Sequence, residues 1–339
     1  MIYFISSIAR LPDPTSSLPF QLRGYTKTFS LYYGLLSSCP RLECVDLVFD
    51  SINHMNKLLK ALAPSESTLR SVKFANTGLI ADYKITTELV HRALKHRTLR
   101  NVEQLTLTSV RNGGAQASND DPRTKLKLVS CTLEVYGTIF RVIKPFLPQD
   151  SSSLRKVSLT FYKLVPQDAT WLFTYLPTTL EELEISLQMS AVSELTVEGY
   201  LNKAHGATDP FPHELLSRFS SLHTLALMGF TLPVQLLITL TSASSKIRRL
   251  NFYDSKWVPF ESSRPTRFLS RITGILDPSL AINLLSPFSR LIDVHLGTLP
   301  TFRIDRYATL RVEMKARGIE FDCDPCIDDE VCEICGERH

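Results

Sequence analysis

The chain has 339 residues and a mass of 38.3 kDa, which is enough for one large domain or two ordinary ones. Hydrophobic residues make up 44% of it and charged residues 21%, which excludes disorder throughout the chain. Glycine is scarce, at 13 residues, and this argues against folds that depend on glycine-rich nucleotide loops.

The chain begins without a recognisable targeting signal. Residues 1–9 are apolar, but they lack a charged start and are too short for a signal peptide. Elsewhere no apolar stretch approaches the roughly 18 residues that a membrane helix needs. We therefore expect a cytoplasmic or nuclear protein with no membrane contact. Residues 1–34 are expected to form an N-terminal cap or a partial repeat.

From residue 35 onward one apolar spacing recurs: an apolar residue, two others, an apolar residue, one other, and a third apolar residue. The clear copies begin at Leu42, Leu69, Val102, Leu154, Leu180, Leu222, Ile247 and Leu291. A further copy, with Leu126 and Leu128 followed by Cys131 and Leu133, lacks its first apolar residue and places Lys127 at the middle, outward position. So many copies in order indicate a repeat architecture.

The spacing predicts a short strand with one buried face in every repeat. Helical periodicity lies between or after the strands, at residues 54–62, 86–96, 137–147, 167–176, 212–219, 233–242 and 304–317. A last strand is expected at residues 319–321. No single unit can bury its apolar face alone, so the repeats must stack on one another. The prediction is an α/β solenoid over residues 35–321, with surface excursions near 111–123, 190–210 and 258–278.

Four segments give the clearest matches to a known repeat pattern: CPRLECVDL (39–47), SSLRKVSLTFYKL (152–164), SLHTLALMGFTL (221–232) and SKIRRLNF (245–252). On these residues the chain resembles the leucine-rich repeat family, and in its irregular repeat lengths the repeat regions of fungal and plant F-box proteins. The resemblance implies a curved, right-handed leucine-rich-repeat solenoid, with a parallel sheet on the concave face and helices outside. The consensus asparagine after the strands is mostly missing, which predicts irregular turns there.

The same resemblance implies a protein-binding function, specifically substrate recognition for a ubiquitin ligase, with a ligase adaptor among the partners. A complete F-box is not found, since Leu42 follows Leu11, Pro12 and Asp13 too closely for a module of about 40 to 50 residues. The partner itself is not identified by the sequence. An F-box-like repeat scaffold without the F-box is the leading interpretation.

If the strands line a concave face, the residues between their buried positions form a partner-binding surface. Basic, acidic and basic groups follow one another along it, which suits a protein of complementary charge. The alternative is that these side chains are polar only because solvent surrounds them. The candidate binding residues are Arg155, Lys156, Glu182, Glu184, Arg248, Arg249, Asn251, Tyr253 and His295.

The C-terminal residues 322–339 form an acidic, cysteine-rich tail. From Glu320 to the end there are eight acidic residues and one basic residue, a net charge of −7, which leaves +11 on the rest of the chain. Two Cys-x-x-Cys pairs suit tetrahedral zinc, although only five residues separate them. The alternative function is a zinc-binding module that docks the tail on a partner or on the solenoid; a reduced tail and an incidental disulfide also stay open. The candidate ligands are Cys323, Cys326, Cys332 and Cys335, with His339 beyond them.

No pattern of catalytic residues is found. His205 and His213 have no recognisable nucleophile motif near them, and both common phosphate loops are absent. Basic residues are scattered and not interleaved with aromatic ones, so nucleic-acid binding is not expected. The sequence therefore predicts no enzyme and no cofactor other than zinc in the tail.

Overall fold

The structure is a computed structural model of the chain. It describes residues 21–24, 29–48, 52–75, 85–86, 96–111, 127–136, 153–161, 166–187, 212–243, 246–258, 276, 278–298 and 304–324. The predicted helices at 86–96 and 137–147, and most of the three predicted surface excursions, lie outside these residues. In this part of the chain no helix is both long and apolar enough to cross a membrane.

The centre of the molecule is one 14-stranded sheet in which the strands pair in parallel. Its order is β1-β2-β3-β5-β6-β7-β8-β9-β11-β13-β12-β10, with β14 beside β13 and β4 beside β5. The strands are β1 Gln21–Gly24, β2 Cys44–Val48, β3 Ser71–Ala75, β4 Ile85–Thr86, β5 Gln104–Arg111, β6 Ser130–Tyr136, β7 Lys156–Phe161, β8 Glu182–Leu187, β9 Thr224–Met228, β10 Thr231–Pro233, β11 Arg249–Asn251, β12 Lys256–Val258, β13 Asp293–Thr298 and β14 Glu320–Asp324.

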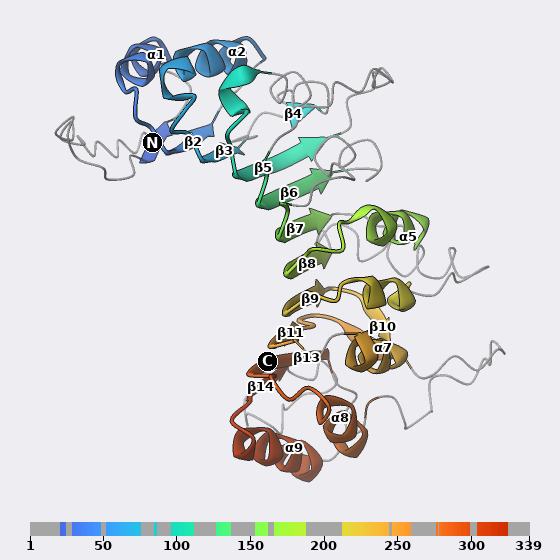
Figure 1. Cartoon of the computed structure of the whole chain (residues 1–339). Helices are drawn as coiled ribbons and strands as arrows, with labels where there is room; N and C mark the ends of the chain where they lie inside the picture. Colours follow the sequence, from blue (N-terminus) through green and yellow to red (C-terminus); the bar gives the residue numbers. More distant parts are fainter. Residues whose placement is uncertain are drawn as a thin grey trace, which may run out of the picture.

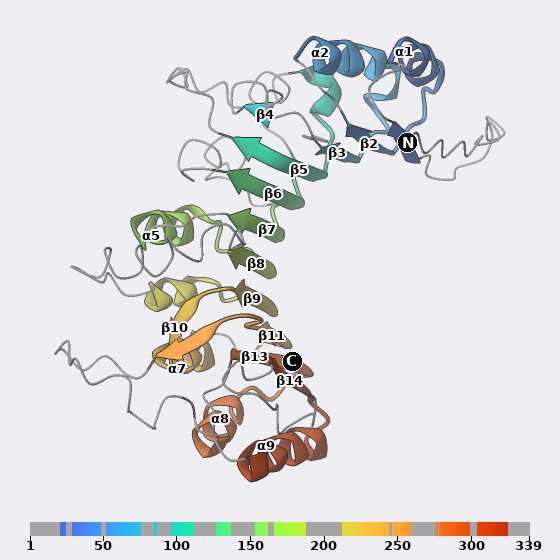
Figure 2. The same ribbon diagram turned by 180° about the vertical axis from the view of Figure 1, so that it is seen from behind.

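The described helices lie along one side of this ladder of strands, and none of them covers the other side of the sheet (Figures 1 and 2). The predicted α/β class, with a parallel sheet and helices outside it, is confirmed in this respect. The helical elements are α1 Phe29–Ser38, α2 Ile52–Ala61, η2 Ala63–Ser65, η3 Arg97–Leu99, α5 Pro166–Tyr175, η5 His213–Arg218, α7 Gln235–Ala243, α8 Pro278–Leu285 and α9 Ile304–Ala316, where η marks a 3₁₀ turn.

The recurring apolar residues form the core between sheet and helices. The middle residue of each copy stands in register with that of the next, so that Val45, Val72 and Leu105 are neighbours across β2, β3 and β5. The same row continues to Val294 in β13, and its described members up to there are at most 2% exposed. Burial of one continuous apolar row is what the repeat spacing predicts, because each strand covers the apolar side of its neighbour.

The sequence interpretation of one repeat is wrong by five residues. The three inward residues of this repeat are Leu128, just before strand β6, and Cys131 and Leu133 within it, and all three are buried. Cys131 pairs in register with Leu105 and Val157, so a small thiol fills an aliphatic position. Burial raises the pKa of this thiol to about 12. The outward residue of this repeat is consequently Thr132 and not Lys127.

Several elements also differ from the sequence predictions. Residues 213–218 form a 3₁₀ turn where an α-helix was expected, and helices α1 and α8 were not predicted. The last strand, β14, continues to Asp324, so three residues assigned to the tail belong to the sheet. Near the C-terminus, Leu310, Met314 and Ile319 are buried and close the hydrophobic core.

Hydroxyl side chains connect successive repeats at the turns that precede the strands. The residue before the first leucine of a repeat donates to the carbonyl of the first leucine in the preceding repeat. Thr68 donates to Leu42 O at 2.9 Å, and Thr179 donates to Leu154 O at 3.2 Å. Ser153 donates to Leu128 O at 3.0 Å in the same way. These bonds satisfy turn carbonyls that would otherwise lie partly buried without a donor.

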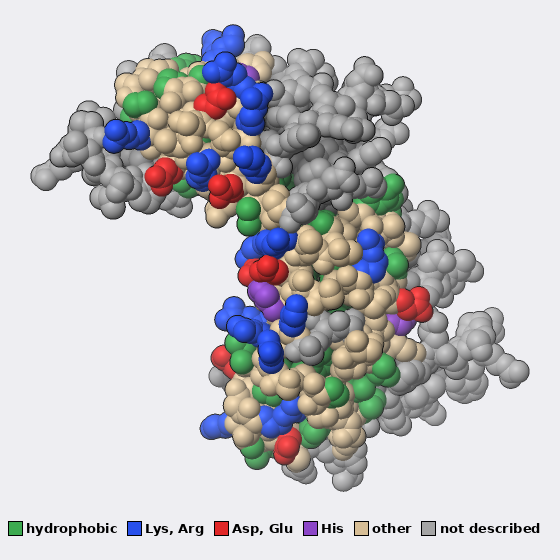
Figure 3. All heavy atoms as spheres, in the orientation of Figure 1, with side chains coloured by type: hydrophobic (Ala, Val, Ile, Leu, Met, Phe, Trp, Pro, Cys, Tyr) green, Lys and Arg blue, Asp and Glu red, His purple; other side chains and the backbone are tan. Residues whose placement is uncertain are grey.

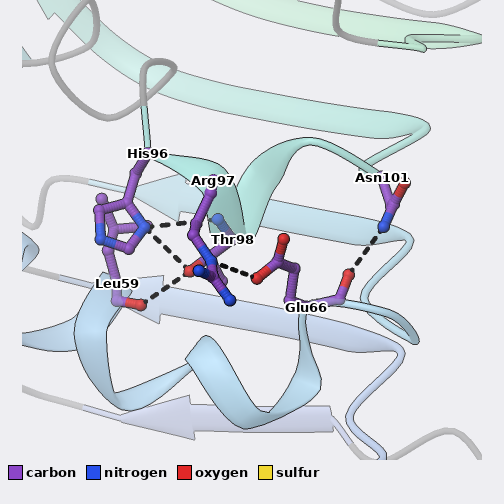
Figure 4. Close-up of polar contacts among 6 residues, drawn as sticks. All are labelled: Leu59, Glu66, His96, Arg97, Thr98 and Asn101. Atoms are coloured by element: carbon purple, nitrogen blue, oxygen red, sulfur yellow. Dashed lines mark hydrogen bonds and ion pairs between the residues drawn. The ribbon is translucent and has the colours of Figure 1, made fainter.

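A second set of polar contacts joins the turns that contain η2 and η3 (Figure 4). Thr98 is fully buried and donates to Leu59 O at 3.2 Å, while Arg97 pairs with Glu66 at 2.7 Å. The backbone N–H of Thr98 donates to Nδ1 of His96 at 3.4 Å. Burial lowers the pKa of His96 from its usual 6.5, with the Glu66 carboxylate opposing the shift and Arg97 and Lys60 adding to it. His96 is therefore held neutral.

Candidate partner-binding site

The sheet face opposite the helices carries three rows of side chains, one residue of each row per repeat. Charged and histidine side chains gather along this side of the molecule (Figure 3). The flanking row, immediately before each strand, contains Arg70, Glu103, Val129, Arg155, Glu181, His223, Arg248 and Ile292. The first outward row contains Gln104, Ser130, Lys156, Glu182, Thr224, Arg249 and Asp293, and the second contains Thr106, Thr132, Ser158, Glu184, Ala226, Asn251 and His295.

Three of the nine predicted binding residues take part in ion pairs between β7 and β8. Lys156 Nζ lies 2.6 Å from Glu182 Oε2, and Arg155 Nε lies 3.4 Å from Glu181 Oε1. Glu181 is shared, because Nε2 of His223 lies 3.6 Å from its other oxygen. The basic and acidic groups that the sequence placed side by side are thus brought together, and they neutralise one another within the sheet.

Two further predicted residues hold backbone turns. Asn251 Oδ1 accepts from Tyr253 N at 3.0 Å, and His295 Nδ1 accepts from Gly297 N at 3.2 Å. Both stand in the second outward row, and each bonds the backbone two residues ahead, which is a turn-stabilising arrangement. Glu184 lies in the same row, half-buried between Ser158 and Ala226.

Arg248 and Arg249 differ from the other cations of this face. Both are exposed, and within the described part of the chain neither has an ion pair or a side-chain hydrogen bond. Arg249 is flanked in register by Thr224 and Asp293, but no contact within 4.0 Å joins it to that carboxylate. The charge of these two guanidinium groups is available to a molecule that approaches the sheet.

Tyr253 is presented beside them by a firmly anchored turn. Its ring is 56% exposed and packs edge-on against His295, with centroids 5.4 Å apart. Phe252 and Ser255 on either side of it are buried, and Ser255 Oγ donates to Leu227 O at 2.7 Å and accepts from Phe230 N at 3.0 Å. Trp257 donates to Leu296 O at 2.6 Å. An aromatic side chain that is exposed on a rigid support is the kind of group that anchors protein partners.

Ile292 belongs to this surface and was missed by the sequence interpretation. It stands in the flanking row next to Arg248, where its N–H donates to Arg248 O at 2.9 Å, and it is 48% exposed. The sequence does contain the signal, since Ile292 directly follows the first apolar residue of its repeat, a position that is charged in most other copies.

The proposed zinc ligands lie mostly outside the described residues, which include only Cys323 of the four. Cys323 stands in β14, half-buried, and packs against the hydrophobic core. Among the described residues no three histidine, cysteine or acidic side chains come together as a metal site would require. The Cys323 thiol thus has a packing role in the sheet, and the zinc site stays a prediction.

Comparison with solved structures shows a distant likeness in fold. No protein-family model and no curated protein sequence matches the chain. A solved structure, the crystal structure of the Rad7 and Elc1 complex in yeast, aligns over 88% of this chain and 74% of that chain, with 13% identity and a TM-score of 0.42. A likeness this distant carries no argument about function.

Proposed function

We propose that the chain is a non-catalytic protein-binding scaffold that contacts its partner through the sheet face around β11 and β13. The proposal rests on a difference in ion pairing between two parts of that face. Charges on and beside β7 and β8 pair with each other, whereas Arg248 and Arg249 are exposed and have no ion pair with any described residue, beside the exposed side chains of Tyr253 and Ile292. Aromatic and arginine side chains are the residues most often found at the energetic centre of protein interfaces.

The finer architecture in this proposal is a curved, right-handed leucine-rich-repeat solenoid with the sheet on its concave side. The parallel ladder and the helices confined to one side support it. In the space-filling view the charged rows lie along a hollowed side of the molecule (Figure 3). A surface of this shape suits a partner that is enclosed over several repeats.

The link to a ubiquitin ligase, and with it a cytoplasmic or nuclear location, stays a prediction from the resemblance to F-box repeat regions. Recovery of a cullin-type ligase adaptor with the purified chain would support it. Specific partners without such an adaptor would leave a general repeat scaffold.

The experiment is affinity purification from reducing cell extract with three full-length chains. These are the wild type, the double variant Arg248→Glu with Arg249→Glu, and a control of equal charge change, Lys57→Glu with Arg311→Glu. Lys57 and Arg311 are exposed on helices α2 and α9, away from the sheet face.

We expect a set of proteins that the wild type and the control retain and the sheet-face variant loses. Equal retention by all three chains, or no specific protein with the wild type, would contradict the proposed function. So would a catalytic turnover that a single substitution in a described residue abolishes.

A further inference from the structure

Two arginines of the flanking row hold the next repeat in the same way. Arg70 Nε lies 3.6 Å from Glu103 Oε1, and its Nη1 donates to Asn101 O at 3.3 Å. Arg155 Nε lies 3.4 Å from Glu181 Oε1, and its Nη1 donates to Thr179 O at 3.4 Å. In both cases one guanidinium group binds a carboxylate and the carbonyl two residues before it. We call this arrangement the arginine bracket.

Arg248 occupies the same position, but no carboxylate of the described residues lies within 4.0 Å of its guanidinium group. The backbone N–H groups of Glu103 and Glu181 donate to Arg70 O and Arg155 O, each at 2.8 Å. The N–H of Ile292 donates to Arg248 O at 2.9 Å, so Ile292 stands where the bracket has glutamate. The backbone hydrogen bond between the two repeats is the same as in the intact brackets, but the acidic side chain is replaced by an exposed aliphatic one.

The surroundings of Arg248 favour an acidic ligand with an apolar part. Arg249 adds a second exposed cation, and the exposed surfaces of Ile292 and Tyr253 supply apolar contact on either side. Opposing charges are near as well: Asp293 flanks Arg249 in register, and Glu181 already pairs with Arg155 and His223. The site therefore suits a single well-placed carboxylate better than a long polyanion.

We infer that an acidic segment of a partner protein completes this bracket, placing an Asp or Glu carboxylate on Arg248 and an apolar side chain against Ile292 and Tyr253. The inference rests on the proposed function and adds the chemistry of the partner to it. The occupant is a partner segment, because the described residues of this repeat and the next place no carboxylate within 4.0 Å of Arg248, and the two exposed cations complement an acidic segment. Arginine suits this task, since its planar fork binds a carboxylate through two parallel hydrogen bonds.

The test uses the full chain and a random twelve-residue peptide library displayed on phage. We expect selected peptides to be enriched in Asp or Glu next to a large apolar residue. A synthetic peptide of the consensus, measured by fluorescence anisotropy, should lose about tenfold in affinity when its central acid is replaced by the matching amide.

Four variants separate the bracket from general surface charge. Ile292→Glu supplies the missing carboxylate internally, so it should weaken peptide binding about tenfold or more while the chain stays folded, and Arg248→Gln should do the same by removing the cation. Ile292→Gln changes polarity without adding charge and should cost less than Ile292→Glu. Arg70→Gln breaks an intact bracket elsewhere and should leave peptide affinity unchanged.

The outcomes distinguish the inference from the function on which it rests. Selected peptides that are not acidic but depend on Tyr253 would overturn the inference and leave the scaffold function standing. Absence of any selected peptide, together with no partner in the purification experiment, would overturn both. If the substitutions Asp328→Asn, Asp329→Asn and Glu330→Gln in the full chain raise affinity about tenfold, the occupant is the chain's own acidic tail, and the partner inference is overturned.

Discussion

The β7–β8 region and the β11–β13 region use equivalent repeat positions in opposite ways. In the first, Arg155 and Lys156 form ion pairs with glutamates of the next repeat, and these pairs connect the two repeats. In the second, no described carboxylate lies within 4.0 Å of Arg248 or Arg249, although Asp293 flanks Arg249 in register, and the turn beside them displays Tyr253. A charged side chain on a repeat surface is therefore available to a partner only where the neighbouring repeat does not pair with it.

The largest expected effect on the free energy of unfolding comes from Gly297→Ala, which would disturb the packing beneath the turn that presents Tyr253. Gly297 has φ +71°, and an added Cβ would overlap the carbonyl oxygens of Phe252 and Ser255, which flank the turn that presents Tyr253. We expect a loss of about 2 to 4 kcal/mol in the free energy of unfolding, measured by urea denaturation. Gly318→Ala is the matched control, since it has φ +72° but open space around it, and it should cost about 1 kcal/mol.

Ser255→Ala should have the next largest effect. The substitution leaves Leu227 O and Phe230 N without their buried hydroxyl partner, which should cost about 2 to 3 kcal/mol in the free energy of unfolding. Because the same hydroxyl anchors the turn of Tyr253, partner binding should fall as well. The exposed Ser242→Ala serves as control, and equal stability of the two variants in urea would contradict the anchoring role.

Double-mutant cycles would measure the difference in ion pairing between the β7–β8 and β11–β13 regions. Replacing Arg155 and Glu181 by glutamine, singly and together, should give a coupling energy of about 0.5 to 1 kcal/mol, as expected for a partly exposed ion pair. The same cycle on Arg248 and Ile292 should give a coupling energy near zero. A similar coupling in both cycles, measured by urea denaturation, would show that the two regions do not differ.

The smallest effect is a pH dependence in the η2–η3 turns. Burial lowers the pKa of His96 in the folded chain, so folding favours the neutral ring. Its contribution to stability is therefore present above the usual pKa of 6.5 and is lost as the pH falls from there through the folded-state value. We expect His96→Asn to be less sensitive than the wild type when urea unfolding at pH 7.5 and pH 5.5 is compared. Equal losses in both chains would assign the pH dependence to other groups.

The sequence predicted the strands well because their signal is local. Three apolar residues at fixed spacing are enough to define an inward face, and eight of the copies lie where the pattern placed them. The copy at Cys131 was shifted because its middle residue is a thiol, which the pattern took for a turn position. Helices α1 and α8 were missed, since they are short and apolar on most sides, without a clear 3.6-residue period.

The binding face could be predicted only in part. The sequence identified the order of charges along it, including Arg248 and Arg249, but not which of them pair. Pairing depends on the register between strands 25 to 45 residues apart, as in Arg155 with Glu181 and Arg248 with Ile292. Ile292 could not be identified as a surface group from its residue type alone, because isoleucine is usually buried.

The amino-acid sequence was enough to predict the repeat, the α/β class and the row of apolar residues that forms the core, because these follow from the spacing of side chains along each strand. The parallel sheet was implied by the resemblance to leucine-rich repeats. The tertiary structure was needed to show which charged side chains form ion pairs. Pairing depends on the contacts between repeats: Glu103 and Glu181 each complete an arginine bracket, whereas Ile292 supplies no carboxylate to Arg248.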